Sequence, residues 1–316
     1  MNQHIPQQTD IVAAHQRIKP YIVKTPVLRS DFLDELCGAE LFFKCENLQK
    51  IGAFKARGGL NAALSLPKEK LSKGICTHSS GNHAQAIALA AKLLNTKAYI
   101  VMPKNAPEIK INGVKELGAE LIFCEPNLEA RENGVKEIIE KYGAEFIHPF
   151  DNYDVIAGQA TASKELMEEQ VDLDCIFAPV GGGGLLSGTG LSAKYFGKKV
   201  QVYAGEPEGA ADAILSFKSK KIEKAPYINT IADGLLTNLS DKTLEIILDT
   251  VIDIFTVSDE EILAALKLIY DRLKIIIEPS CAVPFAALLK NKAAFQNKKI
   301  GIILSGGNVD LAKLKF

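Results

Sequence analysis

Short apolar runs closed by turn residues alternate along the chain with segments whose apolar residues recur at helical spacing. The runs are typical of strands buried in a parallel sheet, and they lie at residues 98–102, 120–124, 175–180, 200–204 and 300–304. Helical spacing is clearest in residues 84–94 and 262–273. This alternation predicts an α/β fold with open parallel sheets that carry helices on both faces.

One block of the pattern is compact enough to form a domain of its own. Residues 74–146 repeat the strand–helix unit, with strand-like runs at 75–77, 99–102 and 121–123. We therefore expect a small domain at residues 74–146, inserted into a larger domain made of residues 1–73 and 147–316.

Composition and net charge argue against some classes of function. Of the 316 residues, 47% are hydrophobic, and 37 basic against 38 acidic residues give a formal net charge of −1. This balance provides no basic surface for nucleic acid or an anionic membrane. No secretory signal or membrane-spanning run is evident, and the six cysteines form no CxxC pair. We expect a cytoplasmic protein that binds neither nucleic acid nor membranes.

The strongest local feature is four consecutive glycines, Gly181, Gly182, Gly183 and Gly184, between a predicted strand and a predicted helix. Without Cβ atoms, their backbone N–H groups can surround an anion, and the helix adds its positive end. We interpret the loop, which continues into Leu185, as a phosphate site. The alternative is a tight turn.

A dinucleotide cofactor is one ligand that could place its phosphate in this loop. Glu206 follows the loop at about the spacing expected for a ribose contact. The glycine fingerprint is broken, however, because its third glycine would have to be Leu186 or Ser187. No Walker-type Gly-Lys-Ser/Thr ending is present. A nicotinamide-dependent oxidoreductase therefore stays open as a rival from another class.

Three further polar loops accompany the glycines. Lys55 lies before a predicted helix at residues 60–66, where the helix dipole favours loss of its proton and hence Schiff-base chemistry; the alternative is a solvated surface lysine. Residues 77–85 and 304–308 each follow a predicted strand. Ligands collect beyond the carboxyl ends of parallel strands, so we expect these loops to meet.

These motifs together resemble the fold type II pyridoxal-phosphate enzymes, and within them the serine racemases and serine/threonine dehydratases. The resemblance runs in family order from about residue 25 to residue 311 and rests on Phe54-Lys55-x-Arg57-Gly58, Ser79-Ser80-Gly81-Asn82-His83, Gly181–Gly184 and Ser305-Gly306-Gly307-Asn308. It implies that the large domain binds the cofactor, that the small domain moves, and that the protein is a homodimer.

The resemblance also implies residue roles. Lys55 would carry the cofactor as a Schiff base, with Phe54 against its ring, Asn82 on the ring hydroxyl, Ser305 on the ring nitrogen and the glycine loop on the phosphate. A small amino-acid substrate would place its carboxylate on Ser79, Asn82 and His83. Ser80 would face Lys55 from the other side as a second base.

The hydroxyl of Ser305 predicts a reaction. A neutral group opposite the ring nitrogen leaves that nitrogen largely unprotonated, which disfavours a long-lived carbanion. Loss of a β-hydroxyl avoids one, so ammonia-lyase activity on serine and threonine fits, and Ser80 permits serine racemisation as well. A hydroxyaspartate dehydratase, with Arg131 as the selecting cation, is the alternative within the family. A catalytically silent binding protein is a further rival.

A metal site is also implied by the resemblance. Glu206, Ala210 and Asp212 match the family segment that binds a divalent cation through two carboxylates and one carbonyl. Oxygen ligands suit magnesium or calcium. The alternative is an ordinary acidic turn.

Two segments depart from the family pattern. Phe150 follows the dehydratase pattern where animal serine racemases have asparagine, and Cys281 and Pro284 stand where small glycine-like residues are usual. The second departure concerns the expected edge of the cofactor ring. Because the chain ends at Phe316, we expect no C-terminal regulatory domain and no feedback control by isoleucine.

Overall fold

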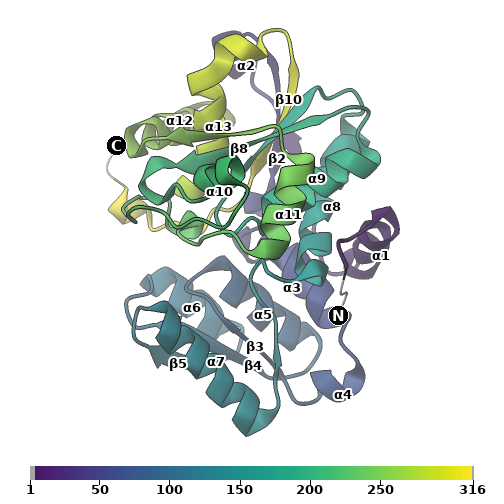
Figure 1. The fold of residues 1–316 in the computed structure, drawn as a ribbon, viewed down its shortest axis with the longest axis vertical. Coiled ribbons are helices and arrows are strands. Elements are labelled where there is room, and N and C mark those ends of the chain that lie inside the picture. The colour runs from purple at the N-terminus through teal and green to yellow at the C-terminus, as the bar shows by residue number, and fades with distance from the viewer. Residues whose placement is uncertain (1–3, 315–316) are drawn as a thin grey trace.

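The computed structural model describes residues 4–314 and contains two separate sheets, one in the upper and one in the lower half of Figure 1. The larger sheet has six strands in the order β1-β2-β10-β7-β8-β9. All neighbouring strands pair in parallel except β1 with β2. Its strands are β1 (Val27–Leu28), β2 (Glu40–Cys45), β7 (Cys175–Pro179), β8 (Gln201–Pro207), β9 (Asp253–Val257) and β10 (Lys299–Leu304).

The smaller sheet has four parallel strands in the order β5-β4-β3-β6. They are β3 (Ile75–His78), β4 (Ala98–Pro103), β5 (Glu120–Cys124) and β6 (Glu145–Phe146). We call this sheet with its helices the four-strand unit, and the larger sheet with its helices the six-strand unit. All four strands lie inside residues 74–146, while the mobility and boundaries of a domain there stay predictions.

Helices cover both faces of each sheet, as the alternating pattern predicted. They are α1 (Gln8–Ile18), α2 (Asp31–Cys37), α3 (Lys55–Leu64), α4 (Lys68–Leu71), α5 (Asn82–Leu93), α6 (Glu108–Glu116), α7 (Leu128–Tyr142), α8 (Tyr153–Glu169), α9 (Gly184–Phe196), α10 (Ala213–Ser219), α11 (Asp241–Thr250), α12 (Asp259–Leu273) and α13 (Pro279–Asn291). Within residues 4–314, every helix falls short of the length and apolarity that a membrane span needs.

Strand β7 shows why the apolar runs are continuous. Its residues Cys175 and Phe177 pack into the core beneath α12 and α13, while Ile176 and Ala178 pack into the opposite core with α9 and α11. Successive side chains of a strand point to opposite faces. Since both faces are covered, every position is apolar and no alternation with polar residues appears.

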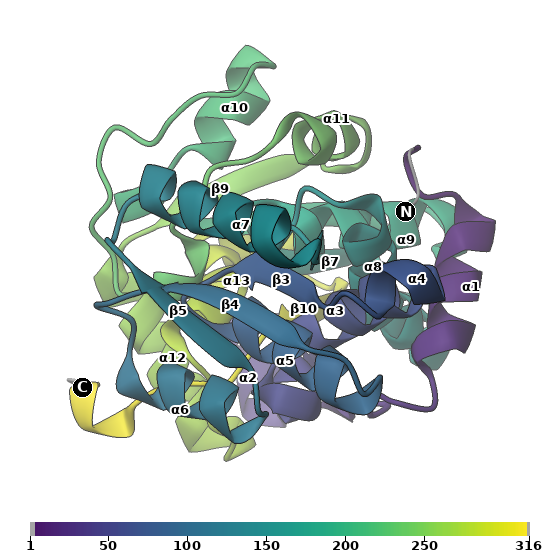
Figure 2. The same ribbon diagram turned by 90° about the horizontal axis from the view of Figure 1, so that it is seen from below.

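The four-strand unit is layered in the same way. Seen from below, α7 lies on one side of β3, β4 and β5, and α5 and α6 lie on the other (Figure 2). On β4, Ile100 and Met102 pack with the α5 side, whereas Tyr99 and Val101 pack with α7. Helix α3 also packs on α5 and α8, so it links the two units.

The helix predicted at residues 60–66 was wrong in its boundaries, because α3 begins at Lys55 and ends at Leu64. Gly58 and Gly59 resemble a helix break in the sequence, but they are contact points within the helix. A Cβ on Gly58 would lie 2.7 Å from the Val155 carbonyl oxygen of α8, and one on Gly59 would lie 2.9 Å from Ala86 of α5. Close helix packing, which no local pattern shows, offsets the low helix propensity of glycine.

Candidate active site

The predicted polar loops meet at the carboxyl ends of both sheets. The loop before α5 follows β3, the glycine loop follows β7, and Ser305 follows β10. The segment before α3 joins them, because Ala53 forms an antiparallel bridge with Gly306 and the Phe54 N–H donates to the Ser305 carbonyl at 3.0 Å. These backbone contacts place Lys55 directly beside the Ser305 loop.

Lys55 is the first residue of α3 and only partly exposed. Its Nζ donates to the Pro149 carbonyl at 2.8 Å and lies 5.2 Å from the centroid of the Phe54 ring. Burial lowers the pKa of this amine from 10.5 to about 8. The lowered pKa agrees in direction with the sequence argument, and its cause is desolvation of the amine.

Asn82 connects three segments of the site. Its Nδ2 donates to Glu278 Oε1 at 2.8 Å, and its Oδ1 accepts a hydrogen bond of 2.8 Å from Asn308 Nδ2. Glu278 stands directly before α13, and burial raises its pKa to about 7. Sequence reasoning missed Glu278 as a site residue; its only signal was membership of the segment expected near the cofactor ring.

The serines before α5 are not used as helix caps. Gly81 is the N-cap residue of α5 and no side chain caps the helix there. The Ser79 hydroxyl accepts a hydrogen bond of 3.3 Å from the Gly81 N–H, and Ser80 is partly buried in the same loop. Ser79 therefore bonds to the backbone just before α5, and its hydroxyl does not occupy the N-cap position itself.

Three of the five histidines lie close together, and the charge of Lys55 acts on two of them, His83 and His148. His83 is buried, with Nε2 3.0 Å from the Ile147 carbonyl oxygen and Nδ1 without a partner among the described residues. Burial, with the positive charge of Lys55, holds the pKa of His83 well below its usual range. Burial lowers the pKa of both His78 and His148 to about 4, so all three rings are neutral at pH 7.

Arg131 lies in the first turn of α7, on the histidine side of the site. Its positive charge lowers the pKa of His78, and its buried Nε has no hydrogen-bond partner among the described residues. The His78 ring in turn stands 5.6 Å from the His148 ring, measured between centroids. Arg131 therefore acts on the site through the effect of its charge on His78.

The glycine loop packs closely against Phe150, Leu235 and Leu239. A Cβ on Gly182 would lie 2.3 Å from the Phe150 ring, one on Gly183 would lie 2.7 Å from Leu239, and one on Gly181 would lie 2.9 Å from Leu235. Gly183 also has a φ of +85°, which only glycine adopts readily. Packing thus accounts for three of the glycines without any ligand, while α9 still directs its N-terminus into this loop.

Glu206, Ala210 and Asp212 lie close together around the end of β8, and both carboxylates are buried. Glu206 accepts hydrogen bonds from the Ala213 and Ile214 N–H groups at 2.6 and 3.0 Å, and Asp212 accepts one of 3.0 Å from Leu239. Burial raises the pKa of Glu206 to about 8 and that of Asp212 to about 6. Among residues 4–314, no three His, Cys, Asp or Glu side chains form a metal-holding group.

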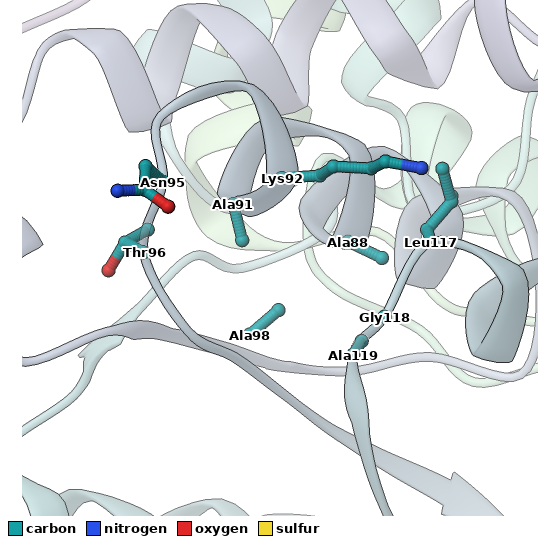
Figure 3. A pocket seen from close by; sticks show the side chains of 9 residues that line it. All are labelled: Ala88, Ala91, Lys92, Asn95, Thr96, Ala98, Leu117, Gly118 and Ala119. Carbon is teal, nitrogen blue, oxygen red and sulfur yellow. The ribbon is translucent and has the colours of Figure 1, made fainter.

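Two surface cavities differ in their relation to this site. One of about 190 Å³ lies where α5 meets the amino ends of β4 and β5, away from the carboxyl-end loops. Figure 3 shows that small alanine side chains and the polar Lys92, Asn95 and Thr96 line it. The other, of about 500 Å³, is lined by Asp151, Ile222 and residues 239–242. Since Leu239 packs on Gly183, this second cavity adjoins the glycine loop.

Comparison with known proteins identifies the family. The model of the pyridoxal-phosphate dependent enzyme family matches residues 18–306. The chain belongs to this family. This membership sets aside the nicotinamide-dependent oxidoreductase, and it confirms the fold class and the resemblance stated from the motifs.

Relatives narrow the group within the family. The chain is 51% identical over 309 residues to a serine racemase of Dictyostelium discoideum, covering 96% of this chain and 95% of the relative. It is 47% identical over 313 residues to a beta-hydroxyaspartate dehydratase of Paracoccus denitrificans, covering 99% of both chains. The crystal structure of the Dictyostelium serine racemase superposes with a TM-score of 0.92 over 96% of this chain and 99% of that one. The enzyme therefore belongs to the serine racemase and β-hydroxy amino acid dehydratase group, which implies a small amino-acid substrate.

The residues of the site fit pyridoxal phosphate. An aldehyde reacts with a neutral amine, and Lys55 has a lowered pKa. The N-terminus of α9, a 13-residue helix, opens at the glycine loop as a phosphate requires. Glu278 Oε2 is buried and has no partner among the described residues, which marks a polar position that the protein alone leaves unsatisfied.

Proposed function

We propose that this enzyme is an ammonia-lyase that converts L-serine and L-threonine to pyruvate and 2-oxobutanoate with release of ammonia, and that it also racemises serine. The observation that carries the proposal is the backbone hydrogen bond from Phe54 to Ser305, which places a lysine of lowered pKa beside a neutral hydroxyl residue. A carboxylate beside the ring nitrogen would favour a long-lived carbanion, whereas a hydroxyl favours elimination.

Each proposed contact with the cofactor comes from a segment that the site brings together. Gly181 to Gly184 and Leu185 would hold the phosphate with their N–H groups. Phe54 would pack against the ring, Asn82 would donate to the ring hydroxyl, and Ser305 would meet the ring nitrogen. Bound pyridoxal phosphate supplies the electron sink that makes the α-proton of an amino acid acidic.

The remaining residues bind the substrate and move its protons. Ser79, Asn82 and His83 would take the substrate carboxylate, and the neutral His83 ring can donate one hydrogen bond without adding charge. The Lys55 amine takes the α-proton on its own side. Ser80, on the other side, would donate its hydroxyl proton when L-serine is inverted and take the α-proton in the reverse direction. It would need help from its surroundings, because the pKa of a free serine hydroxyl is far too high for proton transfer near pH 7.

A second candidate function is hydroxyaspartate dehydration. Arg131 favours it, because a buried guanidinium atom without a partner is suited to the second carboxylate of such a substrate. The relative from Paracoccus denitrificans, named as a beta-hydroxyaspartate dehydratase, adds support. Arg131→Met would then abolish activity on hydroxyaspartate and leave activity on serine within about threefold.

A substrate panel tests both candidates. The purified protein is loaded with pyridoxal phosphate and assayed with L-serine, D-serine, L-threonine and hydroxyaspartate for oxo acid and for inversion. We expect oxo acid from L-serine and L-threonine and D-serine from L-serine. Oxo acid from hydroxyaspartate alone would replace the proposal with the second candidate. A protein whose visible absorbance does not change on borohydride treatment, with Lys55 unmodified, would overturn both.

We further propose that Glu206, Asp212 and the Ala210 carbonyl hold magnesium or calcium, and that the enzyme is a homodimer. Asp212 accepts from the Leu239 N–H and Leu239 packs on Gly183, so a cation there would stiffen one wall of the glycine loop. A chelator should lower the melting temperature of the wild type and not that of Glu206→Gln. An equal effect on both proteins would show that Glu206 and Asp212 form an ordinary acidic turn and bind no metal. Light scattering tests the dimer.

A further inference from the structure

Lys110 is a buried cation of the four-strand unit that pairs with a residue of the six-strand unit. It lies on α6, in the lower half of Figure 1, and only 5% of it is exposed. Its Nζ donates to Asp233 Oδ2 at 2.5 Å, and the Asp233 side chain is 42% exposed. A lysine normally extends its ammonium into water, so burial of this one calls for a specific role.

The Lys110 stem covers the loop that we propose for the substrate carboxylate. A Cβ on Gly81 would lie 3.2 Å from Lys110 Cδ and 3.4 Å from its Nζ. Gly81 stands between Ser80 and Asn82 at the start of α5. The lysine therefore packs on the bare backbone of this loop, and any side chain at position 81 would press against it.

Glu278 contacts the same loop through Asn82. It is buried and accepts a hydrogen bond from Asn82, while the charges of both Lys110 and Asp233 act on it. The Gly234 N–H donates to Ser280 Oγ at 2.9 Å. This bond holds Asp233 next to the segment that contains Glu278, so the partner of Lys110 has a defined position.

We propose that Lys110 is a positioning residue for substrate binding, which through its bridge to Asp233 holds the loop of residues 79–82 in its binding arrangement and joins the two units. The inference rests on the proposed function and adds the residue that orders its carboxylate site. A loop that is ordered for only part of the time lowers apparent affinity by that fraction. Turnover at saturation is unaffected, because bound substrate selects the ordered form.

Three variants test this role by a split between KM and kcat. Lys110→Met keeps the stem and removes the charge, and Asp233→Asn alters the half-exposed partner. For the best substrate of the panel, we expect each to raise KM about tenfold with kcat within about threefold. The double variant should be no worse than Lys110→Met, because both changes break one bridge. Lys104→Met, which removes an exposed pair with Glu125, is the matched control and should leave KM unchanged.

A second readout does not depend on activity. Amide hydrogen exchange of residues 79–85 in the cofactor-loaded protein without substrate should be faster in Lys110→Met and Asp233→Asn than in the wild type. Unchanged KM and exchange, additive effects in the double variant, or a fall in kcat alone would each overturn the proposal. If Lys110→Met does not fold, the KM and the hydrogen exchange of Asp233→Asn alone test the proposal. Failure to take up pyridoxal phosphate would instead overturn the proposed function.

Discussion

The amine of Lys55 shows how one residue acquires its chemistry from its surroundings. The pKa falls from 10.5 to about 8 because the folded chain removes water from the ammonium. The neutral form is therefore half populated near pH 8, and its fraction grows as pH rises.

The rate at which the cofactor-free protein captures pyridoxal phosphate should rise with pH and level off above about pH 8 to 9. A lysine of ordinary pKa would show a rate still rising near pH 10.5. Stopped-flow absorbance between pH 6.5 and 10.5 measures the midpoint. A blocked free lysine in the same buffers serves as the control, and a midpoint shared with it would contradict the burial effect.

Ser80 separates the two proposed activities. In Ser80→Ala we expect serine racemisation to fall at least about 100-fold, the usual contribution of a general acid–base group, while elimination from L-serine stays within about threefold. Chiral analysis of serine and assay of pyruvate in the same reaction give the ratio. Ser79→Ala is the matched control, because it should weaken both activities alike. Equal loss of both in Ser80→Ala would refute the two-base assignment.

At the scale of elements, α3 is held in place by a buried ionic network. Arg57, two residues after Lys55, donates to Glu46 at 2.6 and 2.8 Å and to Glu165 at 2.7 and 2.9 Å. Lys44 donates to Glu165 at 2.9 Å, and all four side chains are at most 3% exposed. The network ties the start of α3 to β2 and α8, so it also positions Lys55.

Arg57→Met should lower the free energy of unfolding by about 3–5 kcal/mol, because it leaves two buried carboxylates with one cation. Urea unfolding of the cofactor-free protein measures this change. Arg29→Met is the matched control, since Arg29 pairs with Asp34 at a partly exposed site and its loss should cost about 0–1 kcal/mol. A similar small loss for both variants would show that the network contributes nothing beyond packing.

At the scale of the molecule, the site is made by two units whose relative position decides its geometry. The loop before α5 belongs to the four-strand unit, whereas Ser305 and the glycine loop belong to the six-strand unit. The predicted mobility of residues 74–146 would therefore open and close the site.

Spin labels test that mobility. A pair at Lys115→Cys and Lys267→Cys, both exposed and on different units, should show a shorter distance when substrate is added. A pair at Lys198→Cys and Lys267→Cys lies within the six-strand unit and should not change. Cys124→Ser removes the one free cysteine that is not buried. An unchanged distance in the first pair would refute a moving small domain.

The sequence by itself determined the fold class and most of the strands, and it marked the polar loops that follow them. The apolar runs were readable because strands buried on both faces need apolar residues at every position. The family could be recognised from the motifs around Lys55, Asn82, the glycine loop and Ser305. Local requirements fix the residue types in these motifs: close approach of the backbone to a ligand and the chemistry of the side chains.

Only the tertiary structure decided which residues far apart in the chain meet. Glu278 beside Asn82 and Lys110 across from Asp233 depend on the packing of the two units. His78 meets His148 and Arg131 through the assembly of the four-strand unit. The tertiary structure also decided the lowered pKa of Lys55 and the point at which α3 begins. The sequence did not predict that α3 begins at Lys55, because Gly58 and Gly59 resemble a helix break although they pack against neighbouring helices. Burial and long-range contact depend on the whole fold, so no local pattern of residues encodes them.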